Sequence, residues 1–252
     1  MSDQQFSGRC VFITGAGAGL GKATALAFAA QGGRVVIAEL DPVSGEATAA
    51  EIRAAGGEAL FVDTDATNEA QVERAIAAAV EAFGPIRHAV NNVGAPRGST
   101  ITGTSLEEWD WSVKMCLTTA FLAMKHEIPV MQAAGGGTIV NIASNTAAVY
   151  TPAAPPAYCA AKGAVIQLTH YASCMHGREG IRVNSVSPGL SATDLVMKNL
   201  PPHVQHEVTS TTQVVPRLTE PHEIAAAVIY LSSDAAAMVN GLDIEVGGGR
   251  LF

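Results

Sequence analysis

Residues 14–21 carry the feature that most constrains the fold, a turn with glycine at every second position from Gly15 to Gly21. A mostly apolar run at residues 9–13 precedes this turn, and a helix-like segment begins at Lys22. The pattern predicts a strand, a tight turn and a helix start. Glycine lets the backbone approach a ligand closely, and the first amides of the helix favour a pyrophosphate group. We interpret the turn as a dinucleotide-binding turn, with an ordinary strand-to-helix turn as the alternative.

The composition indicates a single globular α/β domain over residues 1–252. Hydrophobic residues make up 48% of the chain, which is ample for a core. Lysine and arginine number 15 against 23 acidic residues, so the formal net charge of −8 argues against a nucleic-acid surface. The first residues are polar and no stretch of about 18 residues stays apolar, so we expect no signal peptide, no membrane contact and a cytoplasmic location.

The sequence offers no convincing metal site. The four cysteines have no short paired spacing, so neither a zinc site nor a disulfide framework is indicated and we expect reduced thiols. His203 and His206 are spaced as metal ligands on a helix, but no third ligand is clustered with them. A solvated helix face is the preferred interpretation.

Apolar runs alternate with helix-like segments along the chain. We expect strands at residues 34–38, 59–62, 86–90, 138–143, 182–186 and 242–246, and helices at residues 22–31, 43–55, 68–83, 106–131, 157–175 and 223–232. This alternation predicts a parallel sheet covered on both faces, with ligands beyond the carboxyl ends of the strands. Glu39, Asp65 and residues 91–94 lie at those ends. Residues 190–219 carry little periodic signal, and we expect them to cover the substrate.

Glu39 predicts which dinucleotide is bound. It ends the second expected strand, 18 residues after Gly21, where a carboxylate can accept hydrogen bonds from both ribose hydroxyls of an adenosine. It would repel a 2′-phosphate, and no arginine stands at Ala16, Ala18 or Leu40 to bind one. NAD is therefore favoured over NADP. The alternative is a solvated carboxylate, with Asp41 as the local competitor.

Tyr158 and Lys162 lie one turn apart on an expected helix, 14 and 18 residues after Ser144. Free tyrosine has a pKa of about 10, so it is a poor base at neutral pH unless a neighbour stabilises the phenolate. The ammonium of Lys162, with a positively charged nicotinamide, could supply the roughly 4 kcal/mol required. Ser144 could donate to the same substrate oxygen. An ordinary helix surface pair is the alternative for Tyr158 and Lys162.

Taken together, the glycine turn, residues 91–94, Ser144, the tyrosine–lysine pair and Pro188–Gly189 resemble, in order, the short-chain dehydrogenase/reductases in their form of roughly 250 residues. The resemblance covers the whole chain. It implies a doubly wound Rossmann fold with a seven-stranded parallel sheet, catalysis by serine, tyrosine and lysine, and often a homotetramer, formed here through helices within residues 109–133 and 158–175. Its implied cofactor contacts are Gly15, Gly19, Leu20, Gly21, Glu39, Asp65, Ala66, Asn91, Gly94, Tyr158, Lys162, Pro188, Gly189, Ser191 and Thr193.

The resemblance also exposes departures from the family pattern. Val93 and Gly247 replace an alanine and an aspartate that are usual there, and both look tolerable. Cys116 stands where such proteins usually carry a catalytic asparagine, whose helix kink offers a backbone carbonyl to a water that links the lysine to solvent. Cysteine keeps that carbonyl but is a weaker hydrogen-bonding side chain. We expect turnover to persist, and interpret the thiol as buried and inert rather than redox-active.

The expected substrate is neutral. Residues 149–156 and 195–197, which wall the substrate in the family, are largely uncharged and favour a neutral or aromatic secondary alcohol or ketone. The sequence therefore predicts an NAD-dependent oxidoreductase that moves a hydride between such a substrate and the cofactor, with Tyr158 as general acid and base. One alternative is a 3-oxoacyl-carrier-protein reductase, against which Glu39 argues because that role usually uses NADPH. Another is a dinucleotide-binding sensor with impaired turnover.

Overall fold

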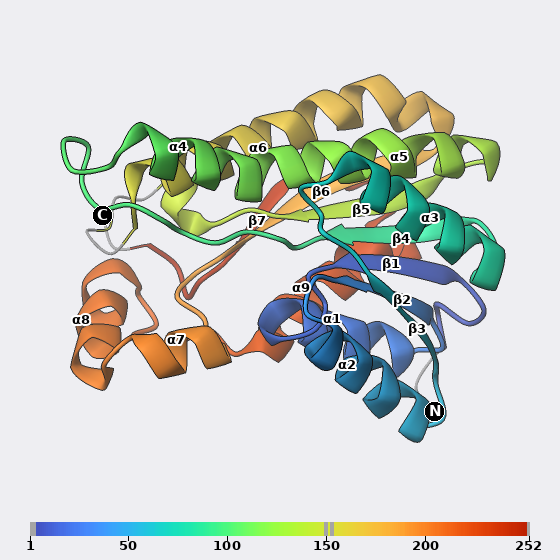
Figure 1. The fold of residues 1–252 in the computed structure, drawn as a ribbon, viewed down its shortest axis with the longest axis horizontal. Helices are drawn as coiled ribbons and strands as arrows, with labels where there is room; N and C mark the ends of the chain where they lie inside the picture. Colours follow the sequence, from blue (N-terminus) through green and yellow to red (C-terminus); the bar gives the residue numbers. More distant parts are fainter. Residues whose placement is uncertain (1–3, 149–150, 152–153, 251–252) are drawn as a thin grey trace.

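A computed structural model describes residues 4–148, 151 and 154–250. Seven parallel strands form one sheet in the order β3-β2-β1-β4-β5-β6-β7 (Figure 1). The strands are β1 (Cys10–Thr14), β2 (Arg34–Glu39), β3 (Glu58–Asp63), β4 (Ile86–Asn91), β5 (Gly137–Ile142), β6 (Ile181–Pro188) and β7 (Asp243–Val246). The predicted seven-stranded, doubly wound parallel sheet is confirmed.

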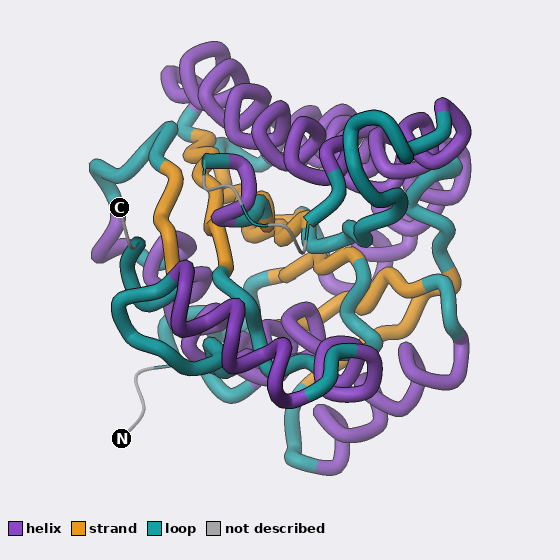
Figure 2. The backbone as a smooth tube through the Cα atoms, turned by 90° about the vertical axis from the view of Figure 1, so that its left-hand side faces the viewer, coloured by secondary structure: helices purple, strands orange, loops and turns teal. Residues whose placement is uncertain are grey.

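Helices cover both faces of the sheet, as Figures 1 and 2 show. One face carries α1 (Gly19–Ala29), α2 (Pro42–Ala54) and α9 (Pro221–Ser232), and the other carries α3 (Glu69–Phe83), α4 (Leu106–Val113), α5 (Thr119–Ala133) and α6 (Pro156–His176). Successive side chains of a strand point to opposite faces, so both must be apolar here. In β1, Val11 and Ile13 join the core under α1 and α9, whereas Cys10 and Phe12 join the core under α3 and α5.

The sheet order reverses between β1 and β4, and this reversal positions the site. From β1 the chain proceeds outward through β2 and β3, and then returns to place β4 on the other side of β1. The connections that follow β1 and β4 therefore diverge to opposite faces and leave a crevice beyond the carboxyl ends of these two strands. The glycine turn follows β1, and Asn92 and Gly94 follow β4.

Residues 106–131, predicted as a long helical stretch, are helical throughout, and a π-helical segment, η1 (Lys114–Thr118), separates α4 from α5 within that stretch. A π turn inserts one extra residue into the helix and bends it. The π-helical segment includes Cys116, which is buried. This segment contains neither proline nor glycine, the two residues that would have marked a break in the sequence.

Residues 190–219 are more ordered than the sequence suggested. They contain α7 (Asp194–Asn199) and α8 (Pro202–Thr212), which lie together beyond one end of the sheet (Figure 1). The signals were local: Thr193 caps α7 by accepting a hydrogen bond from the backbone of Val196, and Pro202 occupies the first turn of α8. Short 3-10 turns complete the fold at η2 (Asn145–Ala147), η3 (Gly177–Glu179) and η4 (Asp234–Ala236).

Candidate active site

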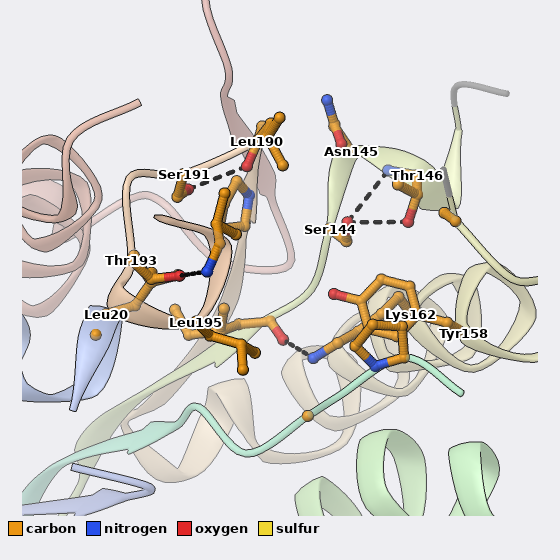
Figure 3. Close-up of a pocket in the computed structure, with 18 of the residues that line it drawn as sticks. Leu20, Ser144, Asn145, Thr146, Tyr158, Lys162, Leu190, Ser191, Thr193 and Leu195 are labelled. Carbon is orange, nitrogen blue, oxygen red and sulfur yellow. Dashed lines mark hydrogen bonds between the residues drawn. The ribbon is translucent and has the colours of Figure 1, made fainter. Parts of the chain in front are cut away.

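A cavity of about 440 Å³ opens beyond the carboxyl ends of the central strands. It brings together the glycine turn, the ends of β4, β5 and β6, the first turns of α6, and both α7 and α8 (Figure 3). Ten of the predicted site residues line it: Gly19, Leu20, Gly94, Ser144, Tyr158, Lys162, Pro188, Gly189, Ser191 and Thr193. Side chains far apart in the sequence thus converge on one space.

The glycine turn leaves the start of α1 free of side chains that would compete with a ligand. A Cβ on Gly21 would overlap the carbonyl oxygen of Gly15, so only glycine fits this close turn. Ala18 begins the helix without a side-chain cap, and no acidic residue stands in the first turn. The first amides of α1 are therefore available to an anion, and the donor set fits a pyrophosphate.

Glu39 lies at the end of β2, beside the glycine turn. Its Oε2 accepts a hydrogen bond from the backbone N–H of Gly17 at 3.0 Å, and its Oε1 accepts from those of Leu40 and Asp41 at 2.8 and 3.1 Å. These bonds fix the carboxylate, whose two oxygens still have lone pairs for ribose hydroxyls. Asp41 is committed elsewhere, because its carboxylate caps α2 by accepting from Val43 and Ser44.

The predicted adenine-side residues follow β3. The Oδ1 atom of Asp65 accepts hydrogen bonds from the backbone N–H and the hydroxyl of Thr67 at 2.8 and 2.7 Å. Ala66 is buried next to it. Neither residue lines the main cavity, so the structure does not bring them together with the residues around Tyr158.

Asn91 and Asn92 face different surroundings, a difference that the sequence analysis did not predict. The Asn91 side chain is buried and donates to Glu127 Oε2 at 3.2 Å and to Asn141 Oδ1 at 3.0 Å, so its polar group faces the core. Asn92 instead lines the cavity and donates to the carbonyl of Gly15 at 2.9 Å. Asn92 thereby links the ends of β4 and β1. The alternation of side chains along a strand was the signal that could have identified it.

Ser144 follows β5 and turns its hydroxyl toward Tyr158. Its Oγ accepts hydrogen bonds from the backbone N–H and the hydroxyl of Thr146, at 3.3 and 2.9 Å (Figure 3). A serine oxygen has two lone pairs and one hydrogen, so these two bonds leave only the donor available. Ser144 and Thr146 both line the cavity. The arrangement suits donation of a hydrogen bond to a ligand oxygen.

Lys162 is held rigidly behind Tyr158. Only 2% of Lys162 is exposed, and its Nζ donates to the carbonyl of Ile142 at 2.6 Å (Figure 3). The same Nζ lies 5.9 Å from the centre of the Tyr158 ring. Burial lowers the pKa of Lys162, and the nearby Cys116 opposes this shift. Gly94 packs against the ammonium so closely that a Cβ there would come within 2.7 Å of Nζ.

Tyr158 is a firmly protonated phenol in the protein alone. Burial raises its pKa to about 12; Cys116 and Cys159 add to the shift, and the Ser144 hydroxyl opposes it. The expected lowering of this pKa required a positively charged nicotinamide beside Lys162, and burial is the largest influence that the residues of the chain exert on it. Tyr158 can therefore serve as an acid as it stands, and as a base only when further positive charge is brought beside it.

Cys116 lies within η1, next to Lys162. Its Sγ donates to the carbonyl of Ala95 at 3.6 Å, and only 1% of the residue is exposed. Burial raises the pKa of the thiol, while Lys162 opposes the shift. A buried, protonated thiol is a weak nucleophile. The described residues also hold no cluster of three or more histidine, cysteine or acidic side chains that could bind a metal.

The comparisons agree with this geometry. A family model described as enoyl-(acyl carrier protein) reductase matches residues 15–250. A relative named short chain dehydrogenase/reductase astE, from Aspergillus oryzae, is 37% identical over 98% of this chain and 97% of its own length. The chain is a short-chain dehydrogenase/reductase. Within the described residues of this oxidoreductase, no helix is long and apolar enough to span a membrane.

Other relatives of this short-chain dehydrogenase/reductase carry more specific names. One is 2,5-dichloro-2,5-cyclohexadiene-1,4-diol dehydrogenase LinX from Sphingobium indicum, 37% identical over 97% of each chain. A solved structure titled 7α-hydroxysteroid dehydrogenase complexed with NADH and 7-oxo glycochenodeoxycholic acid has a TM-score of 0.92 and 28% identity, and covers 99% of this chain and 97% of its own. Family and names together support an oxidoreductase that acts on alcohols.

The outer wall of the cavity of this dehydrogenase is largely apolar. Leu195 and Val196 of α7 line it, as predicted for residues 195–197, and Val208 of α8 extends the same wall. From the other predicted segment, Thr151 and Ala154 line the cavity. Residues 149, 150, 152 and 153 of that segment lie outside the part of the chain that the structure describes.

Proposed function

We propose that this chain is an NAD-dependent dehydrogenase that interconverts a ring-bearing secondary alcohol and the corresponding ketone. The observation that carries the proposal is the convergence of the Ser144 and Tyr158 side chains on one cavity, with the buried ammonium of Lys162 beside them. The uncapped start of α1 opens on the same cavity and supports a dinucleotide.

The chain's own residues divide the work at the substrate oxygen. Ser144 donates its one free hydrogen to that oxygen and holds it beside the Tyr158 hydroxyl. During oxidation Tyr158, as the phenolate, accepts the alcohol proton, and during reduction the Tyr158 phenol donates one. A bound NAD would supply the hydride acceptor and a positive ring. Lys162 would hold the cofactor ribose and adds its own charge toward the phenolate.

Glu39 supports NAD rather than NADP. Its carboxylate is fixed by three backbone N–H groups, so it cannot easily turn away from a 2′-phosphate. The neighbouring Leu40 is exposed and offers no positive charge. A phosphate placed there would meet a negative charge without a partner, whereas two ribose hydroxyls would meet an acceptor.

The substrate class is inferred from the cavity and from the named relatives. An apolar wall of Leu195, Val196 and Val208 faces the serine and tyrosine, and this suits a carbocyclic body that carries one hydroxyl. The relatives include enzymes named for a cyclohexadiene diol and, from Sinomonas cyclohexanicum at 37% identity over 98% of each chain, for cis-4-hydroxycyclohexanecarboxylate.

We also propose that the protein is a homotetramer. Large apolar side chains are exposed along α4, α5 and α6, namely Trp109, Phe121, Tyr171 and Met175. Together they give these helices an apolar outer surface that a second copy of the chain could cover.

The proposed function is tested by following NAD reduction across a panel of substituted cyclohexanols and open-chain secondary alcohols. We expect turnover with ring alcohols, and a loss of at least two orders of magnitude in Tyr158→Phe with NADH binding nearly unchanged. Unaffected turnover in that variant would refute the role of Tyr158. Activity confined to 3-oxoacyl thioesters with NADPH would favour the carrier-protein reductase, and NADH binding without any turnover would favour a sensor.

A further inference from the structure

A second cavity, of about 340 Å³, lies at the opposite edge of the sheet, where the strands begin. Its lining comes from the residue before β1, the first residues of β4 and β6, and the end of α9 with η4. The side chains that matter are Arg9, Arg87, His88, Arg182, Ser232 and Asp234. Neither the predicted catalytic residues nor the dinucleotide turn reaches this place.

The charge of this cavity is unbalanced toward the positive. Three arginines face one aspartate, and none of the three forms an ion pair within the described part of the chain. Arg87 donates to the carbonyl of Ala134 at 2.6 Å, and Arg182 donates to those of Val239 and Ser233 at 3.1 Å each. These bonds fix two guanidinium groups while leaving further N–H donors on both.

Of the three arginines, Arg9 makes the fewest side-chain interactions. No hydrogen bond or ion pair is found for its guanidinium among residues 4–148, 151 and 154–250, although it lines the cavity and is half-buried. Collecting three like charges around one space is unfavourable unless something compensates them. Asp234 supplies one negative charge, which leaves two positive charges in excess.

Two buried polar atoms also lack partners at this cavity. His88 is 3% exposed, and its Nδ1 lies 2.8 Å from the hydroxyl of Thr138, but no described group bonds to its Nε2. Ser232 is 2% exposed, and its Oγ is likewise unpartnered among the described residues. The His88 ring packs against Phe6 and Phe28, and neither unpartnered atom has appreciable accessible surface, so both lie behind the cavity wall. The arginine guanidinium groups are therefore the groups that a ligand in the cavity would meet.

His88 reports the positive charge around this cavity. Burial, together with the charges of Arg9, Arg87 and Arg182, lowers its pKa to about 3, so the ring is neutral and adds no charge of its own. The three guanidinium groups are thus close enough together to act on one buried side chain.

We propose that this cavity binds a tetrahedral oxyanion of the phosphate class, held by Arg9, Arg87 and Arg182. Guanidinium groups bind phosphate oxygens through paired N–H donors, and a tetrahedral anion can accept from strands that approach on different sides. A dianion also matches the two excess positive charges. The ligand is inorganic phosphate or the phosphate group of a small ester.

The test is thermal unfolding of the full chain in increasing phosphate, compared with sodium chloride at the same pH and ionic strength. A ligand that binds only the folded state raises the midpoint temperature saturably. Arg9→Gln is the main variant because the native side chain makes no hydrogen bond that the fold would lose. Arg74→Gln is the matched control, since it removes the same charge from an exposed position on α3.

We expect a saturable rise with phosphate in the wild type and in Arg74→Gln, and a half-saturating concentration at least tenfold higher in Arg9→Gln. Any phosphate at the start of α1 contributes equally to all three proteins, so the difference between the variants reports this cavity. If Arg9→Gln does not fold, Arg87→Gln carries the same comparison, with an expected weakening of several-fold.

Equal phosphate dependence in Arg9→Gln and Arg74→Gln would overturn the proposal, as would a rise that chloride reproduces. A parallel titration with glycerol phosphate distinguishes the two sources of the ligand. Tighter binding of the ester identifies an organic phosphate, and tighter binding of inorganic phosphate identifies the free ion. Both results support the site.

Discussion

At the scale of single residues, Thr146 determines how Ser144 is used. It occupies both acceptor positions of the serine oxygen and so directs the serine hydrogen into the cavity. Thr146→Val keeps the backbone N–H but removes the hydroxyl donor, and the serine can then turn its hydrogen away. We expect a roughly fivefold fall in kcat with little change in KM, because one hydrogen bond of about 1 kcal/mol is lost.

Thr146→Ser provides the matched control, since it retains the hydroxyl and should restore most of kcat. The measurement is steady-state oxidation of a ring alcohol with saturating NAD. Equal rates in the valine and serine variants would show that Thr146 only fills space.

Glu39 is the second residue whose role can be measured directly. NAD should bind at least tenfold more tightly than NADP, which corresponds to about 1.4 kcal/mol. Changing Glu39→Ala together with Leu40→Arg removes the repulsion and supplies a partner for the phosphate, so the preference should narrow or invert. Titration calorimetry with both dinucleotides checks this. Asp41→Asn is the control because that side chain caps α2, and a preference that follows Asp41 instead would contradict the assignment.

At the scale of elements, the π-helical segment η1 survives with cysteine in place of the usual asparagine. The bend is present around Cys116, so the backbone carbonyl at the bend does not depend on an amide side chain. Cys116→Asn should therefore change turnover by about tenfold or less, in a direction set by how well the packed helix accepts the larger group.

The matched control is Cys174→Asn, which alters an exposed thiol and should leave turnover unchanged. Inactivity of the wild type that Cys116→Asn cures would show that the native protein is a binding protein rather than a catalyst. Loss of activity in Cys116→Ser, with folding and NADH binding preserved, would show that the thiol takes part directly.

A buried polar cluster joins α5 to the sheet and should make stability depend on pH. Burial raises the pKa of Glu127 to about 8, and the Asn91 hydrogen bond only partly opposes this. The folded chain thus keeps a proton that the unfolded chain releases near the ordinary glutamate pKa of 4.5. The free energy of unfolding should fall between these pH values, by up to about 1.4 kcal/mol per pH unit.

Glu127→Gln removes the ionisation and should flatten this dependence, whereas Glu81→Gln, an exposed position on α3, should not. Urea unfolding at several pH values is the measurement. A slope that Glu127→Gln leaves intact would mean that another group titrates.

The elements that sequence analysis could predict are those in which one local rule decides the structure. Burial on both faces makes β1 apolar, and the glycines after β1 can only be a close turn. The rest depended on neighbours or on the family resemblance. The π-helical segment at Cys116 contains no proline or glycine to mark it, and only the resemblance implied a kink there; Asn91 and Asn92 look alike until the strand fixes which faces the core. Likewise, spacing placed Lys162 beside Tyr158, but the depth of burial that governs the tyrosine pKa is a property of the whole site.

At the scale of the whole molecule, the exposed apolar surface of α4, α5 and α6 should determine assembly. We expect a native mass of four chains in sedimentation equilibrium. Changing Phe121→Glu together with Tyr171→Glu places charges on that surface and should give smaller species. Val43→Glu, an exposed position on α2, should remain tetrameric. A wild type that sediments as a monomer would contradict the proposal.

Because the strand order reverses between β1 and β4, the cavity is built from distant parts of the sequence. The cavity draws its walls from Gly19 near one end of the sequence, from Ser144 in the middle and from Thr212 towards the other end. No fragment that folds early contains enough of them to retain a dinucleotide. Affinity for the cofactor therefore requires the complete fold. A cell that supplies the cofactor stabilises only fully folded molecules against unfolding.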